Sequence, residues 1–410
     1  MKTGEPMSTF IRPIPVAASQ PGAEASGRLQ THIHIPTPGD HYSPATGSAI
    51  MTIIYELARV HASRGGRTMI VVSRGTRHDY PVGECVEVAP TLPPARWKKA
   101  VDMAAGRLGL IRPFGASAYG PANEAIPANF DGPIFVHNNP VAIPRVKFRN
   151  PNAIVTLWAN NELFRTYSRR EIHRITDAAD RLICCSEYIA RTLRSRIARN
   201  HQKIRVVHNG VDIDRFVPSP QRPDSDLPII LFVGRVNPVK GPDLLIKAAL
   251  RLAGEGRRFK LRIVGNAGFS AEDPLTAYER ELRQLAAPLK DAVEFAPFTD
   301  RERVLHEFHA ASIFCVPSNW DDPCPLTVGE GMACGLPMVV ARRGGIPEVA
   351  GDAALYFDPP AVDQLAQALS QLLQSDQERK QYGDLARQRA EGFAWPKQYE
   401  RLPKHIGRTC

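Results

Sequence analysis

Residues 322–348 read DPCPLTVGEGMACGLPMVVARRGGIPE, and this stretch contains several kinds of local structure in a fixed order. A polar loop with two prolines leads into a helix-like segment that contains Glu330. The apolar run Pro337–Val340 then predicts a buried strand, and Gly344-Gly345 predicts a tight turn before a helix with a proline near its start. This alternation is typical of a parallel sheet that is covered by helices.

The same alternation continues outward through both halves of the chain. An amphipathic helix is predicted over Ile50–Ser63, and a second series of strands begins with Ile204–His208. The other strand candidates are Thr31–Ile35, Thr68–Ser73, Ile134–His137, Ala153–Leu157, Arg181–Cys185, Pro228–Val233, Lys260–Val264, Ala292–Phe295 and Ile313–Val316. The sequence therefore predicts an α/β fold of two doubly wound, Rossmann-like domains that face a central cleft, with the ligand at the carboxyl ends of the strands.

Composition divides the chain into four segments. Residues 1–27 are rich in Pro, Ala, Ser, Gly and Glu, which predicts a disordered leader. Residues 28–202 and 203–390 are the predicted N-terminal and C-terminal domains, and residues 391–410 contain a terminal helix that we expect to return to the N-terminal domain. The insertion over 93–129 is rich in Pro, Gly and Ala, and its sequence predicts no definite fold.

The formal net charge of +10 describes a surface that attracts phosphates on nucleic acid, on anionic lipid or on nucleotide ligands. No basic run resembles a nucleic-acid arm and the aromatic residues show no stacking pattern, so no nucleic-acid partner is expected. The seven cysteines are odd in number and contain no CxxC pair, which argues against a disulfide framework or a zinc site. With no apolar run long enough to span a bilayer and no signal-peptide pattern, we expect a cytoplasmic protein.

The loop GRVNPVKG at 234–241 follows a predicted strand and leads into a helix. Its glycines let the backbone approach a ligand. The Arg235 guanidinium can donate hydrogen bonds to two oxygens at once, and Lys240 supplies a point charge. Such a loop suits a diphosphate, although it lacks the GK[ST] ending of a P-loop. Taken alone, it is equally compatible with a solvated turn that carries basic residues.

Asp322 and Glu330 are carboxylates on either side of a predicted loop-to-helix junction. Because the N–H groups at a helix start bind anions, the backbone at Leu326 and Thr327 is a candidate phosphate site. The two carboxylates can accept hydrogen bonds from sugar or ribose hydroxyls. The alternative for Glu330 is a solvated residue near the start of a helix.

In order and spacing these motifs resemble the C-terminal domain of the retaining GT-B glycosyltransferases of family 4. That family carries a GR-x4-KG diphosphate loop, an acid-x7-Glu motif followed by MA-x-GLP, and a GGIPE turn, which occur here between Gly234 and Glu348. The HNGVD segment at 208–212 also matches a family landmark. The resemblance is dense from Ile204 to about Pro360 and thin before it, and it implies a C-terminal domain that binds the nucleotide sugar.

The resemblance implies a role for each matching residue. Arg235 and Lys240 would neutralise the diphosphate, including the charge that builds on the leaving group, and Glu330 would hold the ribose hydroxyls. Asp322 would hold hydroxyls of the donor sugar near its third carbon. Here the chain departs from the family's usual Glu-Pro-Phe-Gly, because DPCP at 322–325 has a shorter acid and replaces Phe-Gly. This difference leaves the identity of the sugar open.

Four positions in the N-terminal half extend the resemblance. Gly47 lies where the family places a glycine near the donor phosphates, and here Ser48 follows it. His137 ends a predicted strand, where a family histidine lines the catalytic crevice; the alternative is a histidine satisfied within the strand end. Asn161 and Glu162, one strand later, are candidate contacts for the acceptor.

The implied reaction moves a hexose from a UDP- or GDP-linked sugar to an acceptor hydroxyl with retained anomeric configuration. The departing phosphate oxygen would take the proton of the acceptor, and cations and helix N-termini would stabilise the charge without a metal or other cofactor. Asp212-Ile213-Asp214 has the DxD pattern of metal sites in other glycosyltransferases. This pattern lies just after the predicted junction of the two domains at residues 202–203, and no third acidic ligand lies nearby. We therefore do not expect a metal there.

The expected partners are a nucleotide-sugar donor and a glycan or lipid-linked acceptor, as in cell-surface polysaccharide or glycolipid synthesis. The basic-aromatic run RWKK at 96–99 suits peripheral contact with the inner face of an anionic membrane. The alternative is that this run lies on a helix face that is simply exposed to water. Three other functions remain open: a nucleotide-sugar epimerase, a phosphorylase on the same fold, and a catalytically impaired protein that binds sugar nucleotides.

Overall fold

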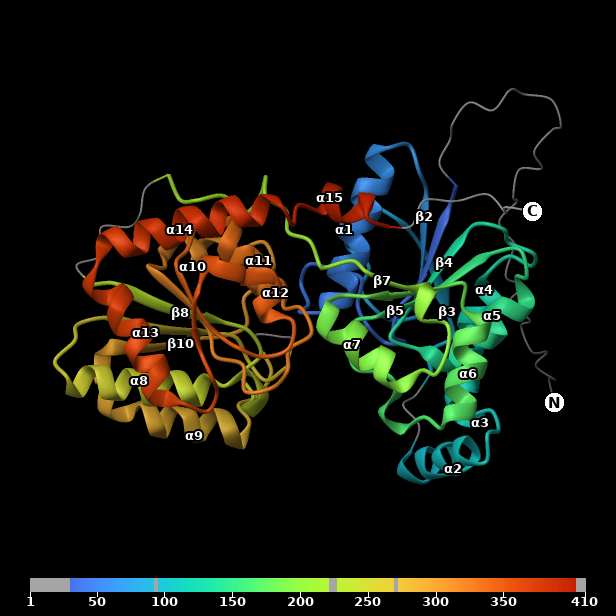
Figure 1. Ribbon diagram of the computed structural model, residues 1–410, viewed down its shortest axis with the longest axis horizontal. Helices are drawn as coiled ribbons and strands as arrows, with labels where there is room; N and C mark the ends of the chain where they lie inside the picture. The colour runs from blue at the N-terminus through green and yellow to red at the C-terminus, as the bar shows by residue number, and fades with distance from the viewer. Residues whose placement is uncertain (1–29, 92–94, 221–226, 269–271, 403–410) are drawn as a thin grey trace, which may run out of the picture.

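The computed structural model describes residues 30–91, 95–220, 227–268 and 272–402, which form two parallel-sheet α/β domains (Figure 1). The first sheet has the strand order β3-β2-β1-β4-β5-β6-β7, and the second has the order β10-β9-β8-β11-β12-β13. Neighbouring strands pair in parallel throughout both sheets. The predicted fold class is therefore confirmed.

The N-terminal domain contains the first sheet and seven helices of the described residues. Its strands are β1 (His32–Ile35), β2 (Thr68–Ser73), β3 (Glu84–Val88), β4 (Pro133–His137), β5 (Ile154–Ala159), β6 (Arg181–Cys184) and β7 (Ile204–Val206). Its helices are α1 (Ala49–Ser63), α2 (Arg96–Arg107), α3 (Pro113–Ala118), α4 (Gly120–Ala125), α5 (Ile143–Arg149), α6 (Arg169–Ala178) and α7 (Glu187–Arg196). The insertion over 93–129 thus contributes α2, α3 and α4.

The C-terminal domain carries helices on both faces of its sheet, with α8, α9 and α13 on one side and α10, α11 and α14 on the other (Figure 1). Its strands are β8 (Ile229–Val233), β9 (Lys260–Val264), β10 (Val293–Ala296), β11 (Ile313–Val316), β12 (Met338–Ala341) and β13 (Leu355–Phe357). Its helices are α8 (Pro242–Gly254), α9 (Ala277–Ala286), α10 (Val304–Ala310), α11 (Leu326–Ala333), α12 (Ile346–Ala350), α13 (Val362–Gln374) and α14 (Asp376–Glu391). One further helix, α15 (Trp395–Glu400), follows.

The inner strands are buried because helices cover both faces of the sheet. All five residues of β4 and all four residues of β12 are buried. The helix α1 buries Ile53, Leu57 and Val60, at three- and four-residue spacing, in one cluster, and Met51 and Ile54 in a second. Ser48 starts α1 by accepting the backbone N–H of Met51.

The strand predicted over Ile204–His208 belongs to the first sheet, not to the second. β7 pairs with β6, where Ile204 lies opposite Leu182, and the chain enters the second sheet only at β8. The prediction was wrong because a short apolar run indicates a strand but not the sheet that the strand joins. The edge strands β3 and β13 were not predicted, since β3 reads ECVEV with exposed acids and β13 has only three residues.

The helix α15 lies against α1 of the N-terminal domain (Figure 1). Trp395 is buried in a cluster with Leu57 and Trp158, and the Tyr399 hydroxyl bonds Nδ1 of His61. The chain therefore crosses between the domains twice, first after β7 and again before α15. The predicted leader over 1–27 and the residues after 402 lie outside the described residues.

The GGIPE turn joins the two domains through Glu348. Its carboxylate accepts the backbone N–H groups of Glu187 and Tyr188, both at 2.6 Å, at the start of α7. It also lies 3.1 Å from Nε2 of His208. Burial raises the pKa of Glu348, but the bonds from His208 and from the two backbone groups outweigh it, so the net pKa lies below its ordinary value.

Candidate active site

A cavity of about 480 Å³ lies between the two domains. Its walls include the loops after β8, β9 and β11 and the start of α1. Ligands of open α/β sheets bind at these carboxyl ends of the strands. The predicted site residues that line the cavity are Gly47, Asn161, Arg235, Lys240, Asp322, Leu326, Thr327 and Glu330.

The loop after β8 brings Lys240 to the cavity wall. Gly241 has a φ of +68°, and a Cβ there would lie 2.0 Å from the carbonyl oxygen of Pro317, so this position requires glycine. The Asn237 side chain accepts the backbone N–H of Lys240 at 3.2 Å. The Lys240 ammonium pairs with the Asp322 carboxylate, which sets the position of this cation before any ligand binds.

Asp322 is almost fully buried, with 4% of its surface exposed, and Lys240 already occupies one oxygen of its carboxylate. Its loop is held by the neighbouring GGIPE turn, where Gly345 donates its N–H to the Asp322 carbonyl at 2.8 Å. Gly344 has a φ of +55°, and a Cβ there would lie 2.2 Å from the same carbonyl oxygen. The Gly-Gly turn therefore supports the acidic loop by close packing.

The helix α11 begins at the cavity wall, with Pro325 as its N-cap and no side-chain cap. The first N–H groups of a helix have no acceptor within it, so Leu326 and Thr327 present N–H donors at the positive end of the helix dipole. Glu330 lies one turn later on the same helix. Its Oε1 accepts a hydrogen bond from Nη1 of Arg301 at 2.6 Å.

Arg301 lines the cavity, although no sequence motif predicted it as a site residue. Burial lowers the pKa of Arg301, but the Glu330 carboxylate outweighs this effect and the net pKa is raised. The backbone N–H of Arg301 also bonds the carbonyl of Pro44 in the N-terminal domain at 3.2 Å. The signal that could have found Arg301 is its place after β10, because site residues gather at the carboxyl ends of strands.

The N-terminal domain contributes the start of α1. Gly47 precedes the N-cap Ser48, whose hydroxyl donates to Asp40 Oδ2 at 3.1 Å. Burial raises the pKa of Asp40. The N-termini of α1 and α11 thus reach the cavity from opposite domains, and together they favour a ligand that carries negative charge.

Asn160 is a second cavity residue that no sequence motif predicted. Its side-chain amide is buried, and within the described residues neither Oδ1 nor Nδ2 has a hydrogen-bond partner. Its backbone N–H donates to Oδ1 of Asn138 at 2.7 Å, which fixes the loop after β5. A buried amide without partners is costly, so Asn160 is suited to bond a ligand in the cavity.

Glu162 does not line this cavity. The Tyr188 hydroxyl donates to its carboxylate, and Glu162 borders a smaller cavity of about 210 Å³ together with Arg165 and Arg196. Asn161 borders both cavities. The structure therefore brings Asn161 to the main site and directs Glu162 to the neighbouring one.

His137 was predicted to line the crevice; it lies fully buried inside the N-terminal domain and is not among the residues that line the cavity. Its Nε2 lies 3.0 Å from Nδ1 of His34 on β1, and its ring stacks on Trp158 at a centroid distance of 5.4 Å. Burial lowers the pKa of His137 to about 3, so the ring is neutral at ordinary pH. The physical reason is the pleat of β4, which directs His137 and Phe135 to the same covered face of the sheet.

Asp212, the first acid of the DxD pattern, makes structural contacts. Its carboxylate pairs with Arg59 of α1 at 2.9 Å. It also accepts the backbone N–H groups of Asp214 and Arg215 at 3.2 Å each. Asp212 therefore joins the linker to the N-terminal domain.

Comparisons with known proteins agree with this architecture. Residues 50–215 match the family model described as Glycosyltransferase Family 4, and residues 215–389 match the model described as Glycosyl transferases group 1. Sucrose-phosphate synthase from Thermosynechococcus elongatus has a similar structure, with a TM-score of 0.69 at 17% identity over 91% of this chain and 97% of that chain. Anabaena Alr3699/HepE in complex with UDP has a TM-score of 0.67 at 17% identity over 91% and 98% of the two chains. The chain belongs to the GT-B glycosyltransferases.

This GT-B glycosyltransferase is 29% identical to Spore coat protein SA of Bacillus subtilis (strain 168) over 66% of its own length and 76% of that protein. It is 34% identical to the D-inositol 3-phosphate glycosyltransferase of Mycobacteroides abscessus over 58% of its own length and 53% of that protein. The match therefore spans about half of the second relative. Within the described parts of the glycosyltransferase, no helix is long and apolar enough to cross a membrane.

Proposed function

We propose that this protein transfers a hexosyl group from a UDP- or GDP-linked sugar to an acceptor hydroxyl with retained anomeric configuration, in polysaccharide or glycolipid synthesis. The observation that carries the proposal is the convergence of three cations, three carboxylates and two helix N-termini on one interdomain cavity. The cations and helix starts suit a diphosphate, and the carboxylates suit hydroxyl groups. A structural neighbour that was solved with UDP is consistent with this donor class.

In this proposal the diphosphate contacts Arg235, Lys240 and the first N–H groups of α11. The start of α1 at Gly47 faces the same ligand from the other domain. Glu330, which Arg301 holds in place, accepts hydrogen bonds from the ribose hydroxyls. Asp322 shares its carboxylate between Lys240 and a hydroxyl of the donor sugar, which restricts the sugars that fit beside its short side chain.

The proposed reaction breaks the bond between the anomeric carbon and the phosphate oxygen and forms a bond from that carbon to the acceptor oxygen on the same face. The acceptor proton moves to the departing phosphate oxygen. The Lys240 ammonium and the N–H groups at Leu326 and Thr327 stabilise the negative charge on that oxygen, without a metal or other cofactor in the proposal. Catalysis then consists of positioning and electrostatic stabilisation.

The acceptor, a glycan or a lipid-linked hydroxyl in this proposal, approaches from the N-terminal domain. Asn161 is the contact that the geometry supports best, because it borders both cavities. Asn160 adds an unpartnered amide in the main cavity. Glu162 contacts only an acceptor that extends into the smaller cavity.

A thermal-shift screen against UDP, GDP and ADP sugars tests donor binding. A donor at 100 times its Kd stabilises the folded state by about 2.7 kcal/mol, so the preferred donor should raise the Tm clearly above the others. Incubation of that donor with a lipid or glycan extract should then yield a product with the anomeric configuration of the donor. The absence of a shift with every donor contradicts the proposal, and a new sugar nucleotide formed without acceptor indicates an epimerase instead.

A further inference from the structure

The insertion between β3 and β4 exposes an unusual amount of apolar surface. Ten large apolar side chains are exposed in the described residues, and six of them lie between positions 97 and 111. Leu108 is 70% exposed, Ile111 is 62% exposed and Trp97 is 60% exposed. We call the six residues together the apolar hairpin face: Trp97, Val101, Met103, Leu108, Leu110 and Ile111. Contiguous exposed apolar residues mark interaction sites in folded proteins.

The helix α2 is oriented opposite to an ordinary amphipathic helix. Its buried residues are Asp102 and Gly106, while Trp97, Val101 and Met103 face outward. An ordinary surface helix buries its apolar face and exposes its polar one. The apolar residues of α2 are therefore exposed by the way the helix is attached to the domain.

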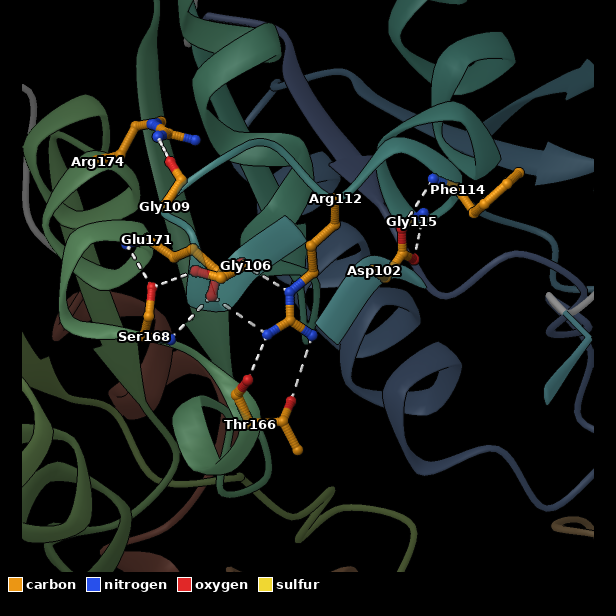
Figure 2. Close-up of polar contacts among 10 residues, drawn as sticks. All are labelled: Asp102, Gly106, Gly109, Arg112, Phe114, Gly115, Thr166, Ser168, Glu171 and Arg174. Carbon is orange, nitrogen blue, oxygen red and sulfur yellow. Dashed lines mark hydrogen bonds and ion pairs between the residues drawn. The ribbon is translucent and has the colours of Figure 1, made fainter. Parts of the chain in front are cut away.

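Polar contacts fix this attachment, as Figure 2 shows. The Asp102 carboxylate accepts the backbone N–H groups of Phe114 and Gly115, both at 2.9 Å, which locks α2 to α3. Arg112 pairs with Glu171 of α6 at 2.7 Å, and both side chains are largely buried. Leu108, Leu110 and Ile111, just before Arg112, therefore lie on a turn that these contacts hold in place.

Two further bonds hold the end of α2 against α6 (Figure 2). The Ser168 hydroxyl donates to the carbonyl of Gly106 at 2.6 Å, and Arg174 donates to the carbonyl of Gly109. A Cβ on Gly106 would lie 2.5 Å from the Glu171 carboxylate, so the helix and α6 are in close contact. The polar residues of the insertion thus face the domain, and the apolar hairpin face points to solvent.

The exposed charges on α2 are all positive. Arg96, Lys99 and Arg107 are exposed and Lys98 is half-buried, whereas the single acid, Asp102, is buried against α3. The Lys98 ammonium lies 5.6 Å from the centroid of the Trp97 ring, which places the cation beside the aromatic residue. Basic side chains next to exposed Trp and Leu are the composition of surfaces that bind the interface of anionic membranes.

We propose that the apolar hairpin face and the cations of α2 dock this protein on a bilayer that contains anionic lipid. Leu108, Leu110 and Ile111 enter the boundary between head groups and acyl chains, and the cations contact the lipid phosphates. Figure 1 shows α2 and α3 at the lower edge of the N-terminal domain, and no residue of the apolar hairpin face lines the interdomain cavity. Docking therefore leaves the interdomain cavity uncovered, and it does not depend on the proposed transfer reaction.

Co-sedimentation of the full chain with vesicles tests this surface. The wild-type protein should bind vesicles of phosphatidylcholine mixed with phosphatidylglycerol and bind pure phosphatidylcholine vesicles weakly. Each cation near an anionic surface contributes on the order of fivefold in binding, so R96A/K98A/K99A should weaken partitioning on the order of 100-fold. The triple variant L108S/L110S/I111S should reduce binding to the level seen with the neutral vesicles. Trp97→Phe should remove a lipid-induced blue shift of the tryptophan emission.

Matched controls change the same chemistry elsewhere. L275S/L385S replaces exposed apolar side chains outside the insertion, and R257A/R258A removes exposed cations of the C-terminal domain. Both should bind anionic vesicles as the wild type does, and all variants should keep the wild-type Tm because none of the changed side chains is buried. Wild-type binding by L108S/L110S/I111S, or equal binding of the wild type to both vesicle types, would overturn the proposal. A lipid-free dimer that this triple variant abolishes would also overturn it and assign the surface to a second copy.

Discussion

Replacing Lys240 by alanine tests the stability and the chemistry of the cavity in one experiment. Asp322 is 4% exposed, and the Lys240 ammonium is the positive charge that pairs with it. The substitution leaves a carboxylate where water has little access and removes a cation from the cavity wall. These two effects have different sizes and different assays, so they can be separated.

The stability cost follows from the burial of the pair. Breaking a fully buried ion pair costs about 3–5 kcal/mol, whereas breaking an exposed one costs about 0–1 kcal/mol. The side chains of Lys240 and Asp322 are 20% and 6% exposed, so the pair lies nearer the buried limit. We expect Lys240→Ala to lower the free energy of unfolding by about 2–3 kcal/mol. Adding Asp322→Asn should restore most of this loss, because no unpaired charge then remains buried.

The turnover should not recover in the double variant. Removing one donor to a developing oxyanion lowers kcat on the order of 100- to 1000-fold, and we expect the same for Lys240→Ala at saturating donor. Urea unfolding measures the free energy of each variant, and the initial rate of nucleoside diphosphate release measures kcat. Lys240→Ala/Asp322→Asn is therefore expected to be stable and nearly inactive.

Lys247→Ala is the matched control, because Lys247 pairs with Asp243 at 3.0 Å with side chains that are 46% and 25% exposed. This substitution should cost about 0–1 kcal/mol and leave kcat unchanged. Near-normal turnover of Lys240→Ala at saturating donor would refute the role of the diphosphate loop. A loss of stability in Lys247→Ala as large as in Lys240→Ala would refute the argument from burial.

Three further substitutions test the framework around the cavity. Arg301→Ala should weaken donor binding about tenfold or more in calorimetry, because Glu330 loses the charged hydrogen bond that orients it. Gly344→Ala should lower the free energy of urea unfolding by about 1–3 kcal/mol, because its Cβ would approach the Asp322 carbonyl at a φ of +55°. The pKa of Glu348 lies below its ordinary value of 4.5. The wild type should therefore have a larger free energy of unfolding than Glu348→Gln, and this difference should reach its full value above pH 4.5 and decrease as the pH falls below 4.5.

Each of these predictions has a control or an outcome that contradicts it. Unchanged donor affinity in Arg301→Ala would show that Glu330 does not need this partner. Gly254→Ala, at a helical glycine with no atom within 4 Å of the added Cβ, should not destabilise the protein, in contrast to Gly344→Ala. A stability difference for Glu348→Gln that is constant with pH would contradict the linkage between its protonation and the interdomain contact.

Local patterns predicted the elements whose causes are local. The strand β8 and the loop after it follow from a buried apolar run and from glycines that the backbone requires, and both are visible in the sequence. The membership of β7 in the first sheet depends on pairing with β6, which no local run of residues encodes. The fold class was therefore predictable, whereas the exact transition between the sheets was not.

The site shows the same limit at the level of side chains. Lys240, Asp322 and Glu330 lie in motifs with a chemical pattern, and the structure brings all three to one cavity. Arg301 lies in the charged run DRER, which in sequence is indistinguishable from a solvated loop, and only the packing of α11 against it reveals the pair with Glu330. For His137 the strand end was predicted correctly, but the direction of its side chain depends on the pleat of β4, which places it on the same face of the sheet as His34 and Trp158.

The return of α15 to the N-terminal domain affects how this enzyme can be recombined with its relatives. Trp395 fills a pocket beside Leu57 and Trp158, so the N-terminal structural unit is not continuous in sequence. A chimera made by a single cut in the linker would combine the pocket of one parent with the tryptophan of the other. If that tryptophan does not fill the pocket, the empty pocket should lower the free energy of unfolding by about 3–5 kcal/mol. Exchange of the N-terminal domain therefore calls for two cuts, so that α15 is exchanged together with the domain that it packs against.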